Sequence, residues 1–399
     1  MFMVSFQNPE TSFTMSSFPV TISPLTGDPI ENRRAEFVER KGIGHPDTIC
    51  DGIAEAISRE LSREYLAEFG RVLHHNTDSV LLIAGDATPE FGGGSLESPI
   101  RIVLGGQATA EVEGTTIPVN EIAERAAREY MVSHFDYLPS GYVDILPHLG
   151  PTSADLQDLF DRGDVLANDT SIAVGYAPLS ETEEIVKTLE PRIWQEIGAA
   201  GKDVKVMGVR TNDRLHLIVA TAILSSRVSS VEEYLDVKAQ IRDLTREHAR
   251  DRSDRDVRVD VNAADNPDDE IVYITETGLS AEDGDDGGIG RGNRVTGLIT
   301  PHRHMSMEAT AGKNPISHVG KLYNVLAKRT AEEIATETDA DFANVHMVSE
   351  IGMPIADPDA VDVETTASNH SAVEDIVRSE AGKIEEITAG IIAGHVGLF

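Results

Sequence analysis

Apolar residues recur at helical spacing in several parts of the chain. Ile49, Ile53, Ile57 and Leu61 fall on one helical face, and Gly70 supplies a stop signal. Similar patterns predict further helices at residues 122–130, 180–197, 231–249, 316–336 and 372–393. A turn and helix cap at 150–156 predict the start of one more short helix.

Short apolar runs between turn residues predict strands. They lie at residues 36–40, 80–84, 100–104, 142–146, 172–176, 204–209, 215–224, 257–261, 271–275, 345–350 and 361–365. The sequence Thr211-Asn212-Asp213 is typical of a hairpin turn and would join two of these strands. Because strand, strand and helix recur in that order, the sequence predicts an α+β fold with mostly antiparallel pairing.

The chain is longer than one hydrophobic core usually supports. At 399 residues it is expected to contain two or three subdomains and to be able to enclose a deep site. Residues 1–18 have no hydrophobic period, so we expect a poorly ordered N-terminal tail there and a folded unit over 19–399.

The composition is strongly acidic. Asp and Glu number 68 against 34 Lys and Arg, and the net charge of −34 is spread along the chain. Such a field repels phosphate backbones and anionic lipids, which argues against nucleic acid or a membrane as a partner. An even acidic coat favours a protein from a high-salt cytoplasm, and an unusually acidic mesophilic protein is the alternative.

Redox and targeting signals are few. Cys50 is the single cysteine, which excludes an internal disulfide and any site built from several cysteines. No apolar run approaches the roughly 18 residues of a membrane span. The N-terminus also lacks the pattern of a signal peptide, so a cytoplasmic location is expected.

The stretch from Glu282 to Asn324 organises the chain. It is rich in glycine and cationic residues, and it has no helical or strand period until its last dozen residues. Leu298, Ile299 and Met305 could anchor it in a core, so a binding loop is favoured over disorder. The stretch completes neither a P-loop nor a Rossmann fingerprint, so any nucleotide site has another design.

Several side chains of this stretch suit a polyphosphate. Closely spaced Arg and Lys beside glycine-rich backbone form an anion cradle, and an aspartate next to it suits Mg²⁺, which binds carboxylates together with phosphate oxygens. These candidates are Asp285, Arg291, Arg294, Lys313, His318 and Lys321. His302 and His304 could suggest another metal, but no third ligand lies near them in the sequence.

His45 and Asp47 precede the first predicted helix. An anion is favoured at a helix N-terminus, so a histidine that faces phosphate is reasonable there. The alternative is that both residues only cap the helix. Asp86, Asp155 and Asp169 also lie at the edges of predicted elements, where they could bind a metal or ligand or simply serve in turns.

Four blocks carry a resemblance to a known family. KGIGHPDTICDGIAEAI, LANDTSIAVGYAP, DVKVMGVR and EDGDDGGIGRGNRVTGLITPHRHMSMEATAGKNPISHVGKLYN occur in this order and resemble archaeal-type S-adenosylmethionine synthases, also called methionine adenosyltransferases. The resemblance covers about residues 35–399. It implies attack of methionine sulfur on C5′ of ATP, followed by hydrolysis of tripolyphosphate to diphosphate and phosphate.

The resemblance also implies residue roles. His45 would contact the bridging oxygen or the adjacent phosphate, with Asp47 and Asp285 holding Mg²⁺, two ions per site being expected. The implied phosphate and ATP ligands are Arg291, Lys313, Lys321, Gly150, Pro151, Thr152, Ser153, Asp155, Lys205, Arg294 and His318. Asp86 would face the methionine ammonium and Asp169 the adenosine or methionine part, while Asn76 would lie near K⁺. Whether Lys202 or Lys205 reaches phosphate stays open, and Lys205 is favoured because it begins a predicted strand.

The family fold implied is three similar, interleaved α+β subdomains around a pseudo-threefold axis. Its active site would be shared between the two subunits of a homodimer. Two alternatives remain: an ATP-binding protein of this fold without adenosyl transfer, and a co-chaperone module, because His45-Pro46-Asp47 is also the signature of J-domains.

Overall fold

The computed structural model describes residues 18–112, 114–152 and 165–399. Three sheets account for most of its strands. The first sheet contains, in order, β15 (Gly287–Gly288), β3 (His75–Ile83), β6 (Ile100–Ala108) and β9 (Val143–Pro151). The second contains β2 (Ala35–Lys41), β11 (Ala200–Thr211), β12 (Arg214–Leu224) and β13 (Asp256–Val261), with β14 (Ile274–Thr275) added to β12. The third contains β10 (Ile172–Ala177), β16 (Ala343–Val348), β17 (Ala360–Thr365) and β1 (Val20–Pro24).

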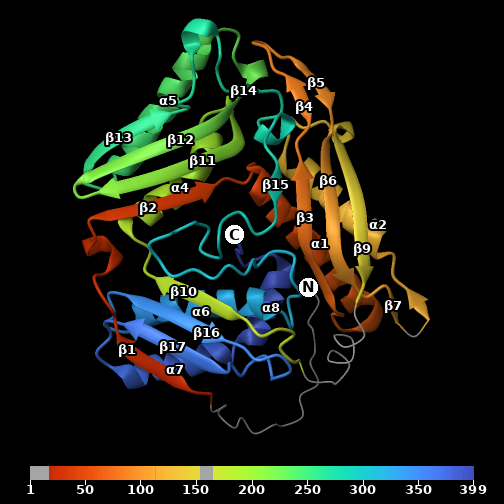
Figure 1. Ribbon diagram of the computed structural model, residues 1–399, viewed down its shortest axis with the longest axis vertical. Coiled ribbons are helices and arrows are strands. Elements are labelled where there is room, and N and C mark those ends of the chain that lie inside the picture. Colours follow the sequence, from red (N-terminus) through yellow and green to blue (C-terminus); the bar gives the residue numbers. More distant parts are fainter. Residues whose placement is uncertain (1–17, 113, 153–164) are drawn as a thin grey trace.

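Helices pack on each sheet and form three separate cores. The first sheet packs on α1 (Pro46–Phe69) and α2 (Val119–His134), and the second on α4 (Glu181–Glu196) and α5 (Val231–Arg250). The third packs on α6 (Val319–Glu337), α7 (His370–Ala381) and α8 (Ile384–Ala393). In Figure 1 the strands lie mostly in front and the helices behind, with the segment that follows β15 between the three sheets. Two small hairpins, β4 (Asp86–Thr88) with β5 (Ser95–Ser98) and β7 (Glu111–Val112) with β8 (Thr115–Thr116), complete the strands of the described residues.

The same pairing pattern occurs in all three sheets. The two central strands pair antiparallel, one edge strand adds antiparallel, and the other edge strand adds parallel. The predicted α+β class with mostly antiparallel pairing is therefore confirmed. Each parallel strand is the exception that the sequence pattern did not predict.

The chain exchanges edge strands between the sheets. β2 joins the second sheet, whereas the helix that follows it, α1, covers the first. In the same way, β10 joins the third sheet before α4 covers the second, and β15 joins the first before α6 covers the third. None of the three sheets is thus built from one continuous stretch of chain.

Helix α1 shows how the sequence determines both ends of an element. Its apolar stripe, Ile49, Ile53, Ile57 and Leu61, is completely buried in the first core. Each such side chain contributes roughly 1.5–3 kcal/mol by leaving water. Gly70 ends the helix in the left-handed conformation, φ 69°, which glycine adopts without a steric penalty.

Two predicted elements differ from the structure. The final helix, predicted over 372–393, is broken into α7 and α8 at Gly382, where glycine weakens the helix. The strand predicted over 271–275 is reduced to its last two residues, because Ile271 turns back to pair with Asn266. Phe18, which the predicted tail included, is buried in the third core, whereas residues 1–17 lie outside the described residues.

None of the helices in the described part of the chain is both long and apolar enough to cross a lipid bilayer.

Candidate active site

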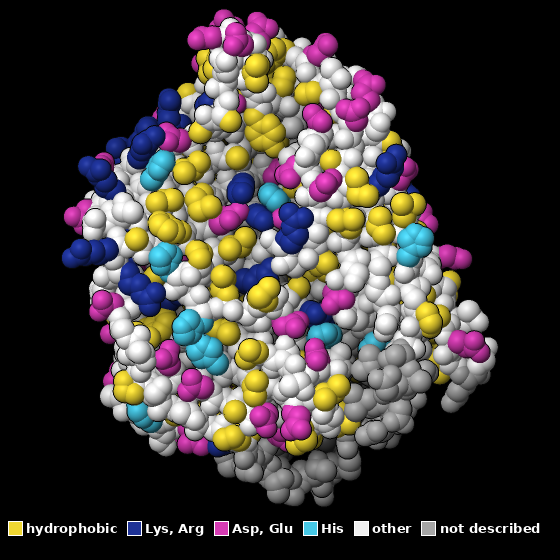
Figure 2. Space-filling model, in the orientation of Figure 1, with side chains coloured by type: hydrophobic (Ala, Val, Ile, Leu, Met, Phe, Trp, Pro, Cys, Tyr) yellow, Lys and Arg dark blue, Asp and Glu magenta, His cyan; other side chains and the backbone are white. Residues whose placement is uncertain are grey.

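His45 is the N-cap residue of α1. Figure 2 shows Lys and Arg side chains gathered near the centre of the displayed face, between hydrophobic side chains. The loop before His45 needs glycine, because a Cβ on Gly44 would come within 2.5 Å of the Asp203 nitrogen. The Asp47 N–H donates to His45 Nδ1 over 3.2 Å. Neutral His45 therefore carries its hydrogen on Nε2, where it can be donated to a ligand.

The charge state of His45 follows from its surroundings. Burial, and then the charge of Lys41, lower the pKa of His45 to about 4. The nearby carboxylates of Asp47 and Asp285 act in the opposite direction but do not compensate. At neutral pH the ring is thus an uncharged hydrogen-bond donor beside lysine.

The carboxylate of Asp47, two residues after His45, has three close contacts. Its Oδ1 accepts from the Gly288 N–H over 2.9 Å, and its Oδ2 accepts from Lys41 Nζ over 2.8 Å. Arg291 lies 3.4 Å from Oδ1. Burial alone would raise the pKa of Asp47, but the hydrogen bonds from Lys41 and Gly288 outweigh it and lower the pKa. Asp47 is therefore ionised.

Asp47 is the first of three buried carboxylates on one face of α1. Asp51 Oδ1 accepts from the Gly290 N–H over 2.9 Å, and Glu55 Oε2 accepts from the Gly312 N–H over 3.1 Å. Residues four apart lie on the same side of a helix. We call Asp47, Asp51 and Glu55 the carboxylate row, and it fixes the glycine-rich segment against α1.

Asp203 is a site residue that the sequence analysis missed. It lies on β11 and is only 4% exposed, and burial raises its pKa to about 7. Its Oδ2 accepts from the Ser280 N–H over 2.9 Å, and the Ser280 hydroxyl contacts both Asp203 and Asp285, the latter at 3.1 Å. The signal in the sequence was its position between Lys202 and Lys205, in a chain poor in lysine.

The structure separates Lys202 from Lys205. Lys202 Nζ donates to the His134 carbonyl over 2.6 Å and lies over the Trp194 ring, away from His45. Lys205 pairs with Glu39 at 3.1 Å and contributes to the lowered pKa of His45. Lys205 is therefore the lysine of this pair that lies beside His45.

A second group of candidates lies at the other end of the carboxylate row. Lys313 pairs with Asp78 at 2.9 Å and with Glu308 at 3.2 Å. Lys321 is fully buried and pairs with Glu55 at 2.7 Å. This salt bridge connects α6 to the carboxylate row, and the phosphate role of Lys321 stays a prediction.

His318 forms the N-cap of α6 in this second group. Its Nδ1 accepts from the Gly320 N–H over 3.2 Å, and burial together with Lys313 lowers its pKa well below the usual value. His74 lies near it and contacts Thr152 Oγ1 at 3.2 Å. Thr152 is thus near the second group, where the Asn168 N–H also donates to the Ser317 carbonyl.

The remaining candidates are spread more widely. Gly150 and Pro151 end β9 opposite Gln107 and Ala108. Asp86 lies in β4, and Asp169 lies before β10, where its carboxylate accepts the Thr170 N–H. Ser153 and Asp155 lie outside the described residues.

Arg294 is occupied within the glycine-rich segment. Its Nη2 donates to the Gly290 and Gly292 carbonyls over 2.5 and 2.9 Å. Arg291, in contrast, has an exposed side chain that could turn to a ligand.

The two groups are separated along one helix. The His45 group, which is His45 with Lys41 and Asp47, lies at the start of α1. The Lys313 group, which is Lys313 with Lys321 and His318, lies beside Glu55. Glu55 is about two helical turns further along α1, which corresponds to about 12 Å along the helix axis. No set of three or more His, Cys, Asp or Glu side chains is arranged for a metal within the described residues. A cation here would need oxygen ligands from a substrate as well as from protein.

A neutral histidine on a helix N-terminus, next to lysine, arginine and carboxylates, is typical of an enzyme site for a phosphorylated substrate. Residues 19–395 match the S-adenosylmethionine synthetase (AdoMet synthetase) family. The chain belongs to this family.

Curated relatives are similar in sequence to this protein over nearly the whole chain. The probable S-adenosylmethionine synthase of Aquifex aeolicus is 46% identical, over 92% of this chain and 96% of the relative. The S-adenosylmethionine synthase of Pyrococcus furiosus is 45% identical, over 93% and 95%, and that of Haloarcula marismortui 43% identical, over 96% and 100%. A solved S-adenosylmethionine synthetase from Campylobacter jejuni, described as unusual, has a TM-score of 0.61 at 16% identity and covers 90% of this chain and 94% of its own, which supports the fold.

Proposed function

We infer that the protein synthesises S-adenosylmethionine from ATP and L-methionine. The family match over residues 19–395 carries this conclusion, and the neutral His45 at the start of α1 supports it. A sulfur lone pair of methionine forms the bond to C5′ while the C5′–O bond breaks, and the electron pair leaves with tripolyphosphate. Hydrolysis of tripolyphosphate to diphosphate and phosphate completes the reaction.

We propose that His45 donates its Nε2 hydrogen to the oxygen that leaves C5′. Negative charge develops on this oxygen in the transition state, and a donor fixed before the reaction stabilises it without reorganisation. Lys41 and Lys205 lie near His45, and Arg291 lies beside Asp47, so all three can supply positive charge for the leaving group. The roles assigned to Lys313, His318, Asp86 and Asp169 remain predictions.

Mg²⁺ and K⁺ fit the donor atoms in part. Asp47 and Asp285 offer carboxylate oxygens near His45, so we assign them to Mg²⁺ together with phosphate oxygens. Bound Mg²⁺ would neutralise charge on the phosphates. Asn76 Oδ1 is buried without a hydrogen-bond partner among the described residues, and an unpaired amide oxygen suits K⁺.

A homodimer is proposed as the active form. The two groups of candidates lie about 12 Å apart along α1, on one side of a site whose opposite side a second copy could supply. Leu81, Ile83 and Leu146 are between 37% and 46% exposed on the first sheet. Exposed apolar side chains on a sheet face are typical of a surface that a partner covers.

The salt concentration and the compartment in which the enzyme works remain predictions. The net charge of −34 favours a high-salt cytoplasm, and a relative from Haloarcula marismortui is consistent with it.

The decisive experiment follows the products. The purified protein is incubated with ATP, L-methionine, Mg²⁺ and K⁺ in concentrated KCl, and phosphorus NMR and mass spectrometry identify what forms. We expect S-adenosylmethionine with diphosphate and phosphate, and none of these without methionine. ADP would indicate phosphoryl transfer instead, and unchanged ATP would indicate a binding protein of the same fold.

A further inference from the structure

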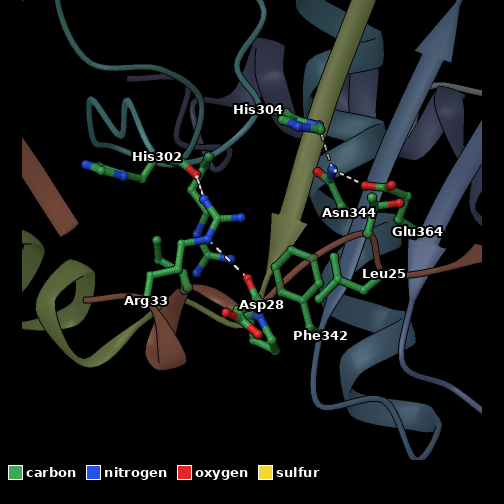
Figure 3. Close-up of a pocket in the computed structure, with 12 residues that line it drawn as sticks. Leu25, Asp28, Arg33, His302, His304, Phe342, Asn344 and Glu364 are labelled. Carbon is green, nitrogen blue, oxygen red and sulfur yellow. Dashed lines mark hydrogen bonds between the residues drawn. The ribbon is translucent and has the colours of Figure 1, made fainter. Parts of the chain in front are cut away.

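Two histidines far apart in the sequence meet outside the His45 and Lys313 groups. His304, in the segment between β15 and α6, places its Nδ1 2.8 Å from Nε2 of His346 on β16. His304 is exposed and lines a cavity of about 300 Å³, and the His346 side chain is 25% exposed. Figure 3 shows the His304 ring turned toward Asn344. The pair can therefore be reached from solvent.

A third polar side chain lies against the pair. Asn344 Nδ2 is 2.9 Å from His304 Nδ1 and 3.4 Å from His346 Nε2. The other amide atom, Oδ1, is buried and has no hydrogen-bond partner within the described residues. Half a turn of the amide exchanges the two atoms and brings the oxygen to the position that faces both rings. The position left behind lacks a partner in either orientation, so the exchange loses nothing there.

The three positions fit around one metal ion. The circle through them has a radius of about 1.8 Å, so a point about 2.1 Å from all three, a usual metal–nitrogen distance, lies about 1 Å out of their plane. At this distance, 2.8 Å between the ring nitrogens of His304 and His346 corresponds to nearly a right angle at the metal, whereas a tetrahedral ion needs about 3.4 Å. Near-right angles with nitrogen and oxygen ligands are typical of Ni²⁺ and Cu²⁺.

The charges near the pair also favour a cation. Burial, and then the charge of His304, lower the pKa of His346, so its ring is neutral at neutral pH, as a metal ligand must be. His346 Nδ1 lies 3.8 Å from Asp362 Oδ2. A metal on Nε2 leaves the hydrogen on Nδ1, where a carboxylate can orient the ring, as is common for metal-bound histidine. Glu364 Oε2, 3.4 Å from Asn344 Nδ2, adds a second negative charge.

The arginines of the same cavity do not oppose this cation. Arg303 is paired with Glu183 at 2.8 Å, so its charge is compensated. Arg33 lies on one side of the cavity in Figure 3, and Asn344 lies on the other. The side of the cavity that carries the histidine pair is therefore the one with uncompensated carboxylates.

We propose that His304, His346 and Asn344 bind a divalent transition-metal ion that prefers right angles between its ligands, such as Ni²⁺ or Cu²⁺. The two imidazole nitrogens and the amide oxygen occupy one face of its coordination sphere. The described residues add no third His, Cys, Asp or Glu to the pair, so water completes the coordination. The ion joins the segment between β15 and α6 to β16 of the third sheet.

The test titrates NiCl₂ into the untagged full-length protein in concentrated KCl, with and without Mg²⁺, and measures binding by calorimetry. We expect one Ni²⁺ per chain, with the same affinity in both conditions. His304→Gln and His346→Gln should each weaken binding at least about tenfold, because each removes a nitrogen ligand. His302→Gln is the matched control and should leave binding unchanged. His302 lines the same cavity, but its ring packs edge-on against Phe37, with centroids 4.9 Å apart.

A further variant addresses the orienting carboxylate. Asp362→Asn should weaken Ni²⁺ about tenfold, as loss of a contact behind a metal-bound histidine does, and thermal unfolding without metal establishes that each variant is folded. Three results would overturn the proposal: no saturable Ni²⁺ binding, which would leave the pair an ordinary hydrogen bond; equal losses in His302→Gln and His304→Gln, as for diffuse binding to surface histidines; or displacement of Ni²⁺ by Mg²⁺, which would place the ion at the carboxylates of the active site.

Discussion

The carboxylate of Asp51 accepts a hydrogen bond of 2.9 Å from the backbone N–H of Gly290. The matching contact between Asp47 and Gly288 lies one turn earlier along α1. This relationship joins the first helix of the chain to a segment more than two hundred residues later. Burial raises the pKa of Asp51 to about 7, with Gly290 and Arg294 acting against it. The middle of the carboxylate row therefore differs from its ionised first member.

Asp51→Asn should change how stability depends on pH. In the unfolded chain Asp51 ionises near pH 4, whereas in the folded protein it keeps its proton until about pH 7. Folding stability is therefore lost as pH rises between these values, by up to about 1.4 kcal/mol per pH unit. Urea denaturation from pH 4 to 8 at constant KCl should show this loss in the unmodified protein and a smaller one in Asp51→Asn. Parallel curves for the two proteins would contradict it.

His45→Ala should lower kcat far more than it raises the Kd for ATP. The hydrogen bond is made to charge that develops in the transition state, so we expect a loss in kcat of about 10²–10³. His216→Ala is the matched control, because His216 is paired with Asp260 on the second sheet, away from the site. Steady-state kinetics and equilibrium binding of ATP separate the two effects. Equal losses in kcat and in ATP affinity would refute the assigned role.

Gly287→Ala should disturb the start of α1. A Cβ at this position would come within 2.3 Å of the Pro46 carbonyl oxygen, a contact with backbone that must move. We expect a stability loss of about 1–3 kcal/mol and lower activity, since β15 carries the contact to Asp47. Gly198→Ala, where nothing lies within 4 Å, is the control. The pair is compared by denaturation and by product formation, and similar behaviour of both variants would argue against the close approach.

Leu81→Asp should dissociate the proposed dimer. Leu81 is 46% exposed on the first sheet, and a buried carboxylate in an interface is costly. Val132→Asp makes the same kind of change on α2, at a residue 53% exposed, and should leave the assembly intact. Light scattering after size-exclusion chromatography measures the mass. A monomer in the unmodified protein, or equal effects of both variants, would exclude this interface.

Stability should rise with KCl concentration. The 68 acidic side chains repel one another in dilute buffer, and salt screens this repulsion over a Debye length of about 10 Å at 0.1 M and about 3 Å at 1 M. Thermal unfolding in increasing KCl should show a rising midpoint, and sucrose at equal osmolality should not reproduce the full effect. Full stability in dilute buffer would remove the high-salt interpretation without affecting the enzyme assignment.

The local elements could be predicted because their signals are local. The apolar stripe of α1 and its stop at Gly70 were visible in the sequence and are confirmed. The hairpin of β11 and β12 followed from its turn residues. The break at Gly382 was missed because a single glycine inside a helical pattern is often tolerated.

Long-range relationships could not be predicted in the same way. The segment around Gly288 was predicted to be a binding loop, but its attachment to Asp51 and Glu55 depends on residues hundreds of positions apart. Asp203 escaped notice because its position between two candidate lysines, just before the predicted strand, gives no sign that its carboxylate is buried. Lys321 could be identified as unusual, whereas only the structure shows its pair with Glu55.

The exchange of edge strands sets an order on folding during synthesis. The second sheet has its principal strands once β13 has been made, because β2 precedes them. The first sheet must wait for β15, and β1 must wait for β17, almost the whole length of the chain. Until then β1 lacks its partner and the third core lacks its sheet. The nascent protein therefore carries unpaired strands for most of its translation, and the finished fold cannot be divided into fragments that each keep a complete sheet.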